Sequence, residues 1–362
     1  MAMGQSACCR LNSVILAAAL ILLQASSVTV VGPQQIAGVR EPQTFVGEHG
    51  IHVVYGTKDT IYCSTSDDGG KSFARPVKVA DAQNLMIGSR RGPRVTVSSR
   101  NVVVTAIVDG NVKCWISPSN GKWFSDSPAQ INDMPGSAAE GLHAAAAGEN
   151  EIACAWLDNR DGGQEVYSSV SQDGGENWGP NVLVYKSPGG SVCECCSPSV
   201  AIASGGAIYV MFRNSLSGNR DMYVTSSSDD GQTWSTAKQM DGGHWKLDMC
   251  PMDGGALDAD DQAQVFAIWR RGENVYRAKI GRPETKVAAG VQPWIYAGQT
   301  VYGAYLKQRP GPLMVFEGSA PPHAISHDAD DPMIAGPASG EGPIVVVWTT
   351  SKGEILCQRI DD

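Results

Sequence analysis

One short motif recurs along the chain, and its spacing limits the possible folds more than any other feature. Three copies share the pattern Ser-x-Asp-x-Gly-x-(Ser, Asn or Thr)-aromatic and begin at Ser66, Ser171 and Ser227. A degenerate copy begins at Ser117, so the copies follow one another at about 50 to 56 residues. Asp and Ser side chains bond turn amides and Gly supplies positive φ, so each copy predicts a hairpin turn inside a repeated unit.

Each motif ends a larger unit that contains three strand-like runs. The fourth unit shows them at 197–203, 207–213 and 221–228. Comparable units open at Pro42, Pro93, Leu142, Pro198, Pro251, Pro293 and Pro332. The seventh unit lacks a fourth strand, which residues 28–36 can supply by closing a ring. The pattern predicts an all-β fold, a β-propeller of six or seven four-stranded blades, and the repeat count favours seven.

Composition excludes several classes of protein. The chain has 41 glycines and is 18% charged, which disfavours coiled coils and helical bundles. Its net charge of −9 argues against nucleic acid as a partner, because such binding needs clustered Lys and Arg.

The first 27 residues have the layout of a secretory signal peptide. Arg10 precedes an apolar run at 14–23, and small residues follow it. The run is too short to span a bilayer, although an uncleaved anchor remains an alternative. We therefore expect a signal peptide at 1–27 and one propeller domain at 28–362, in a secreted or periplasmic protein that does not span the membrane after cleavage.

Eight cysteines follow the signal segment. Four of them lie in strand-like runs and are interpreted as buried thiols, namely Cys63, Cys114, Cys154 and Cys357. The other four are Cys193, Cys195 and Cys196 at the opening of the fourth unit and Cys250 at the opening of the fifth. Adjacent blades would bring these loops together, and disulfides that join them are the favoured interpretation. A soft-metal site for Cu(I), with His143 or His244 as further ligands, and free buried thiols are the alternatives.

The recurring motif resembles the Asp boxes of the sialidase-like (BNR-repeat) β-propellers. In that family the box lies on the turn between the third and fourth strands of a blade, away from the catalytic face. The resemblance therefore implies a structural role for Asp68, Asp173 and Asp229.

The same resemblance implies a set of site residues. Sialidases hold the substrate carboxylate with three arginines, and the matching positions here are Arg40, Arg213 and Arg270, with Arg271 as an alternative to the last. They use a Tyr–Glu pair as nucleophile and an Asp as acid or base. Tyr305 and Asp81 are the corresponding candidates, and Asp253, or Asp248, stands where the glutamate is expected. Trp294 and Trp245 lie in loops that we expect at the same end of the propeller, and they are candidates for stacking on a sugar.

These residues predict an exported propeller that acts on glycans, with a glycan or anionic saccharide as partner and no cofactor. An exo-sialidase type of glycoside hydrolase is the leading hypothesis. The missing glutamate and the seventh unit depart from the sialidase pattern, and leave open whether the protein is an enzyme. The alternatives are a non-catalytic propeller that binds glycan or protein, and a metal-binding propeller that uses the four cysteines.

Overall fold

The computed structural model describes residues 26–118, 120–240 and 243–361. All but the last two residues of the predicted signal peptide lie outside these ranges, as does Ser119 of the degenerate motif. The described residues form 27 strands and no helix. Accordingly, nothing in the described ranges forms a helix with the length and apolarity needed to cross a membrane.

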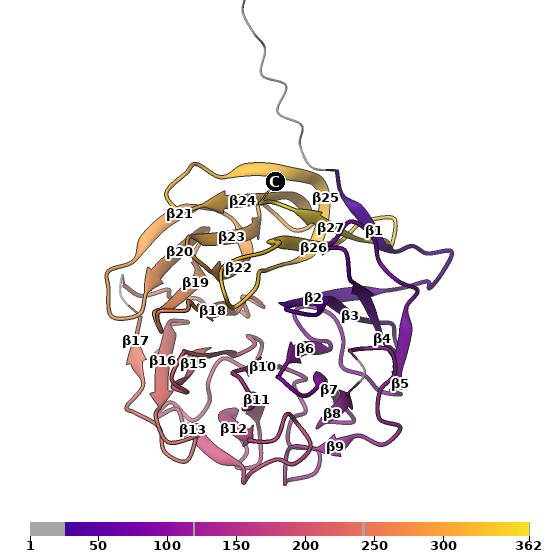
Figure 1. Ribbon diagram of the computed structural model, residues 1–362. Coiled ribbons are helices and arrows are strands. Elements are labelled where there is room, and N and C mark those ends of the chain that lie inside the picture. The colour runs from indigo at the N-terminus through magenta and orange to yellow at the C-terminus, as the bar shows by residue number, and fades with distance from the viewer. Residues whose placement is uncertain (1–25, 119, 241–242, 362) are drawn as a thin grey trace, which may run out of the picture.

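Five blades are separate four-stranded antiparallel sheets arranged around one axis, each with its first strand innermost (Figure 1). Blade one contains β2 (Arg40–Gly47), β3 (Gly50–Gly56), β4 (Thr60–Ser66) and β5 (Val77–Asp81). Blade two contains β6 (Arg94–Val97), β7 (Val102–Val108), β8 (Asn111–Ser117) and β9 (Ala129–Gln130). Blade three contains β10 (His143–Ala147), β11 (Ile152–Asp158), β12 (Glu165–Ser171) and β13 (Val182–Tyr185). Blade four contains β14 (Ser199–Ile202), β15 (Ile208–Arg213), β16 (Met222–Ser227) and β17 (Lys238–Gln239). Blade five contains β18 (Gly255–Ala259), β19 (Val265–Arg271), β20 (Asn274–Lys279) and β21 (Thr285–Ala289).

Blades six and seven share one long strand. Their common sheet contains β22 (Val291–Ala297), β23 (Val301–Leu306), β24 (Gly311–Glu317), β25 (His323–Ala335), β26 (Val345–Thr349), β27 (Ile355–Arg359) and β1 (Val28–Val31). The first half of β25 pairs with β24 as the outer strand of blade six, and the second half pairs with β26 as the inner strand of blade seven. The predicted all-β propeller is confirmed, and the described residues make seven blades.

The ring is closed by the two ends of the propeller. Strand β1 pairs antiparallel with β27, with Val28 opposite Cys357 and Val31 opposite Ile355. The N-terminal segment therefore supplies the outer strand of the last blade, as the sequence predicted. Ring closure of this kind leaves few free sheet edges.

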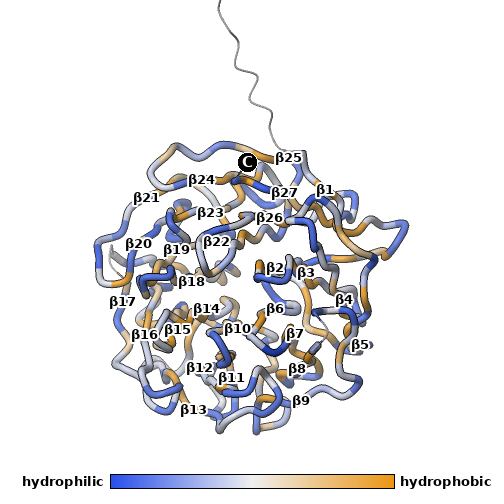
Figure 2. Tube along the Cα trace, in the orientation of Figure 1, coloured by the Kyte–Doolittle hydropathy of each residue, from blue (hydrophilic) through white to orange (hydrophobic). Residues whose placement is uncertain are grey.

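Hydrophobic layers between neighbouring blades hold the ring together. Successive residues of a strand point to opposite faces, so Val53 packs toward blade seven and Val54 toward blade two. In the same way, Val103 packs toward blade three and Val104 toward blade one. Because both faces are covered, the strands are continuous apolar runs, visible as orange stretches separated by hydrophilic loops (Figure 2). The thiols of Cys63, Cys114, Cys154 and Cys357 lie buried in these layers, as predicted.

The recurring turns join the third strand to the fourth in blades one, three and four. In blade three the Ser171 hydroxyl and the backbone N–H of Asn177 both donate to Oδ1 of Asp173, at 2.8 Å each. Gly175 has a φ of 91° and donates its N–H to the Ser171 hydroxyl at 2.9 Å. Only a residue without Cβ adopts this backbone easily, and here it also lets the turn pack closely on Val103 of blade two. The turns are thus built from local hydrogen bonds and rest on the preceding blade.

Replacing Asp173 by alanine is expected to lower the free energy of unfolding by about 1 kcal/mol, because the turn loses its hydrogen-bond acceptor. Chemical denaturation checks this value, with Asp126→Ala, an exposed aspartate of blade two, as the control. Equal stability of the two variants would contradict a structural role for the turn.

Candidate active site at the propeller axis

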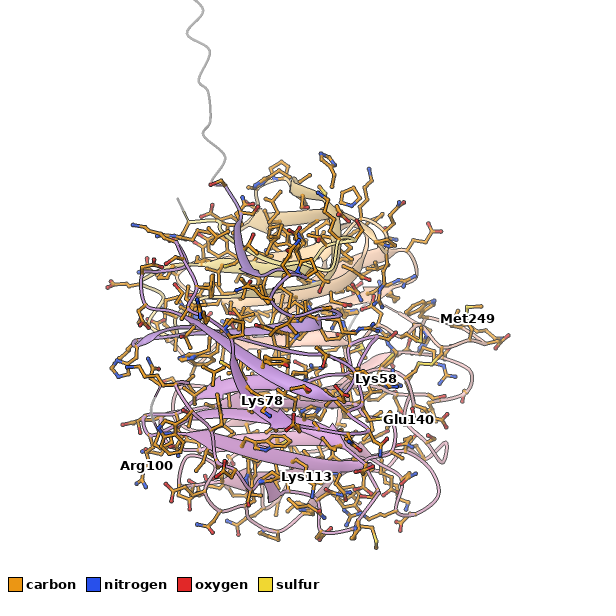
Figure 3. All side chains as sticks on the ribbon, turned by 90° about the vertical axis from the view of Figure 1, so that its right-hand side faces the viewer. Lys58, Lys78, Arg100, Lys113, Glu140 and Met249 are labelled. Carbon is orange, nitrogen blue, oxygen red and sulfur yellow. A yellow bond between two sulfur atoms is a disulfide. The ribbon has the colours of Figure 1, made fainter. Side chains whose placement is uncertain are left out.

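The loops that lead into the inner strands gather at one end of the propeller, which we call the mouth face. Glu140 and Met249 belong to such loops and lie at one side of the molecule, whereas Arg100, between β6 and β7, lies at the other (Figure 3). Loops that carry binding residues commonly cluster at one end of a rigid scaffold.

Five buried polar residues come together where the inner strands begin, and we call them the axial ring. They come from five blades and are Glu41, Arg90, Asp253, Gln292 and Asp331. The N–H of Arg90 donates to Oε1 of Glu41 at 3.0 Å, and Nη2 of Arg90 lies 3.7 Å from Oδ1 of Asp253. Gln292 continues the ring, since its N–H donates to Asp253 at 2.9 Å and its Nε2 to Asp331 at 3.4 Å. The carboxyl groups of Glu41 and Asp331 interact electrostatically, which completes the ring.

Three members of the ring share an unusual backbone. Glu41, Gln292 and Asp331 have φ values of 53°, 52° and 49°, and each precedes a proline. In all three blades the pairing register of the inner strand shifts at this point. A non-glycine residue in this left-handed region is strained, and such strain concentrates at functional sites. The repeated distortion brings the three polar side chains into one cluster at the axis.

The carboxyl groups of Glu41 and Asp331 influence each other's pKa. Burial raises the pKa of Glu41 to about 8, and the nearby Asp331 carboxylate acts in the same direction. Burial also raises the pKa of Asp331, while Arg309, whose Nη2 lies 2.9 Å from its Oδ1, opposes that shift. At neutral pH Glu41 therefore keeps its proton.

Asp253 has the opposite surroundings. Arg90 faces one of its oxygens, and Nη1 of Arg270 lies 3.8 Å from the other. Arg90 also donates to the carbonyl of Pro293 at 2.8 Å and stacks on Trp294, with 4.8 Å to the ring centroid. The Nε and Nη1 atoms of Arg90 are buried without a hydrogen-bond partner among the described residues. Two carboxyl groups in contrasting environments, one protonated and one facing cations, are the arrangement that acid–base chemistry needs.

The structure brings together some of the residues that the sequence predicted. Asp253 is a member of the axial ring, Arg270 ion-pairs with it, and Trp294 covers Arg90. Trp245 lies half-buried beside them, 5.4 Å below the guanidinium of Arg270.

Arg213 is buried among backbone carbonyl groups of the mouth loops. Its side chain is 1% exposed, and it donates to the backbone carbonyls of Arg220, Asp253 and Arg270. These bonds occupy all three nitrogens of its guanidinium, so Arg213 holds the mouth loops of blades four and five in place. Arg40 is exposed at the start of β2, and it is its neighbour Glu41 that enters the ring.

Two further candidates lie apart from the ring. Asp81 ends the outermost strand of blade one, where its exposed carboxylate pairs with Lys78 at 2.7 Å. Tyr305 is buried in the hydrophobic layer between blades five and six, and burial raises the pKa of its hydroxyl. The acid and nucleophile implied by the resemblance are therefore not assembled with the arginines.

The sequence interpretation did not single out Glu41, Arg90, Gln292 or Asp331. A signal was present in three of them, since Glu-Pro, Gln-Pro and Asp-Pro occupy the same place at the openings of units one, six and seven. Reading the repeat in register shows a polar residue before proline each time. Arg90 carries no comparable signal, because it lies three residues before Pro93 and the residue directly before that proline is Gly92.

The four cysteines of the mouth lie together, and a disulfide joins Cys195 to Cys250, as the favoured interpretation predicted. It links the loop before β14 to the loop before β18. The Sγ of Cys193 lies 3.6 Å from that of Cys196 and 3.7 Å from that of Cys195. The hydrogen bond between Cys193 and Cys196 lowers the pKa of Cys193 to about 6.

His143 and His244, which the sequence suggested as further metal ligands, are not grouped with the three cysteines Cys193, Cys195 and Cys196. His143 is buried on β10, and its Nε2 lies 3.1 Å from the Thr105 hydroxyl. His244 is exposed, and its Nδ1 lies 2.7 Å from the Asp221 carboxylate.

The fold and the axial ring define a seven-bladed β-propeller with a buried charged cluster at its mouth. No protein-family model matches the sequence, and no curated protein matches it either. Among solved structures, the chain is similar to the α-L-arabinofuranosidase Arb93A from Fusarium graminearum, with a TM-score of 0.56 and 12% identity over 93% of this chain and 98% of that one. It is also similar to the virginiamycin B lyase from Staphylococcus aureus, with a TM-score of 0.58 and 12% identity over 93% of this chain and 99% of that one. A third structure, the Hadza microbial sialidase Hz136, has a TM-score of 0.55 and 13% identity over 92% of this chain and 68% of that one. At such low identity these likenesses show the shared β-propeller fold alone.

Proposed function

We propose that this protein is an exported glycoside hydrolase whose chemistry takes place at the axial ring. The observation that carries the proposal is the pair of contrasting carboxyl groups, Glu41 and Asp253, on the mouth face. Glycoside hydrolysis uses two carboxyl groups in this way, one protonated and one ionised. Two of the proteins with a similar fold, the arabinofuranosidase and the sialidase, bear the names of glycosidases, which agrees with the proposal.

In the proposed reaction Glu41 is the general acid. Burial and the nearby Asp331 carboxylate keep it protonated at neutral pH, so it can give a proton to the departing glycosidic oxygen. Asp253 is the second carboxyl group, and it pairs with Arg90 and Arg270 where it can assist water or the developing positive charge on the sugar.

The substrate class follows from the groups beside the ring. Trp294 and Trp245 present half-buried aromatic faces that suit stacking on a sugar. Arg270 is part-exposed and has the planar donor array that pairs with a carboxylate, which favours an anionic saccharide. A sialic acid is one such sugar, so exo-sialidase activity is the specific form of the proposal that should be assayed first.

Replacing Glu41 by glutamine is expected to lower kcat/KM about 100-fold or more, because the amide has no proton to give. The assay is turnover of a fluorogenic sialoside, with an α-L-arabinofuranoside and other glycosides as a panel. In the wild type the rate should fall as pH rises through about 8, where Glu41 loses its proton. Glu48→Gln, an exposed change at the opposite end of β2, is the matched control. Full activity of the Glu41 variant would refute the assigned role.

The same variant has a second readout that does not need a substrate. The pKa of Glu41 is about 8 in the folded protein and 4.5 ordinarily, so between these values the folded state holds a proton that the unfolded chain has released. The free energy of unfolding should therefore fall as pH rises from about 4.5 to 8. Glu41→Gln should remove this loss, which denaturation at several pH values measures.

Burial of the ring favours one alternative, a propeller that binds glycans without hydrolysing them. Glu41 and Asp253 are each only 2% exposed, so a substrate must displace neighbouring loops to reach them. On this alternative the panel shows no turnover, while glycan binding is detectable and weakens in Trp294→Ala.

A further inference from the structure

The sulfur atoms at the mouth have the spacing of a metal site. The Sγ atoms of Cys193, Cys195 and Cys196 all lie within 4.8 Å of one another, with two separations of 3.6 and 3.7 Å. Tetrahedral thiolate ligands at about 2.3 Å from a zinc ion stand roughly 3.8 Å apart.

We propose that Cys193, Cys195, Cys196 and Cys250 form a redox-controlled site for a thiophilic d10 metal ion, Cu(I) or Zn²⁺. In the oxidised form Cys195 and Cys250 are bonded to each other, and two thiols remain. A dithiol reductant converts this disulfide to two thiols and itself becomes a cyclic disulfide. The four thiols then release their protons as the ion binds, so that reduction opens the site and oxidation closes it.

Burial and charge both favour such a site. Cys193 and Cys196 are fully buried, which shields a bound ion from water. The guanidinium groups of Arg213 and Arg220 act on Cys193 as nearby positive charges. A cluster of thiolates around one small cation carries excess negative charge, and these arginines would compensate it.

The loop of Cys250 gives the reductant and the ion a way in. Cys250 itself is exposed, unlike the other three cysteines. Met249 and Met252 flank it and are 69% and 45% exposed. Thioethers in this position can capture a soft ion, and they favour Cu(I) over Zn²⁺.

Metal uptake by the purified mature protein tests the proposal. The protein is reduced with a dithiol under anaerobic conditions, desalted, and titrated with Cu(I) in one arm and Zn²⁺ in the other. We expect one ion per chain after reduction, with a thiolate-to-metal charge-transfer band in the copper arm. Uptake should fall at least 10-fold without reduction and in Cys193→Ser. Cys63→Ser, which removes a buried thiol of the layer between blades one and two, should bind like the wild type.

Alkylation mapping keeps the test decisive if a variant fails to fold. In the reduced wild type a bound ion should protect Cys250, the exposed member of the four, from iodoacetamide, and a chelator should remove that protection. The proposal is overturned if fully reduced protein, verified by thiol count, takes up neither ion, or if Cys193→Ser folds and binds as tightly as the wild type. These measurements do not involve glycan turnover, so they stand apart from the assay of the proposed function.

Discussion

Arg213→Ala is expected to lower the free energy of unfolding by about 4 kcal/mol, because a buried guanidinium leaves several carbonyls without a donor. The side chain donates to the carbonyl of Arg220 at 2.6 Å, to that of Asp253 at 2.9 Å and to that of Arg270 at 3.0 Å. These carbonyls belong to blades four and five, so the loss would loosen the contact between them. Chemical denaturation followed by far-UV circular dichroism measures the change.

Two comparisons sharpen this test. Arg213→Lys should recover little of the stability, because one ammonium group cannot reach carbonyls on three sides as the planar fork does. Arg100→Ala, an exposed change on the opposite face (Figure 3), should leave stability within about 0.5 kcal/mol of the wild type. If Arg213→Ala unfolds like the wild type and loses only substrate affinity, then Arg213 is a substrate ligand after all.

Val31→Asp is expected to prevent ring closure and to cost about 4 kcal/mol or abolish folding, because it buries a carboxylate with no partner. Val31 is fully buried in the layer between blades seven and one, together with Val53 and Val347. Thermal unfolding and size-exclusion chromatography detect the loss of stability and any aggregation through the uncovered edge of β27.

A matched control lies two residues away on the same strand. Thr29 is exposed, so Thr29→Asp adds the same charge to β1 at a position that water reaches, and should change stability by less than about 1 kcal/mol. Equal effects of the two substitutions would mean that β1 does not close the ring through its buried face.

Much of the fold could be predicted from the sequence because a propeller repeats itself. The turn motif needs Asp, Ser and Gly at fixed spacing to satisfy its own hydrogen bonds, and such local requirements leave a visible pattern. The closing role of the N-terminal segment followed from counting, since the seventh unit lacked one strand. The position of the four cysteines at the openings of adjacent blades favoured a disulfide between the two loops, and the structure identified the pair as Cys195 and Cys250.

The site was only partly predictable, and the reason is clearest for the arginines. A sequence shows that Arg213 closes a strand near the mouth, but it cannot show which atoms receive its hydrogen bonds. Those acceptors are backbone carbonyls of loops that meet only in the folded ring. A buried anchor and a substrate ligand have the same appearance in the sequence.

The sequence by itself determined the repeat, the closure of the ring and a count of six or seven blades, because each depends on local chemistry or on counting units. It also placed four cysteines in two neighbouring loops. Only the tertiary structure decided the composition of the axial ring. Arg90 from blade two reaches Asp253 and Pro293 in blades five and six, which are about 160 to 200 positions away in the chain. Their meeting depends on seven blades closing around one axis, and burial at that meeting point is what gives Glu41 its raised pKa.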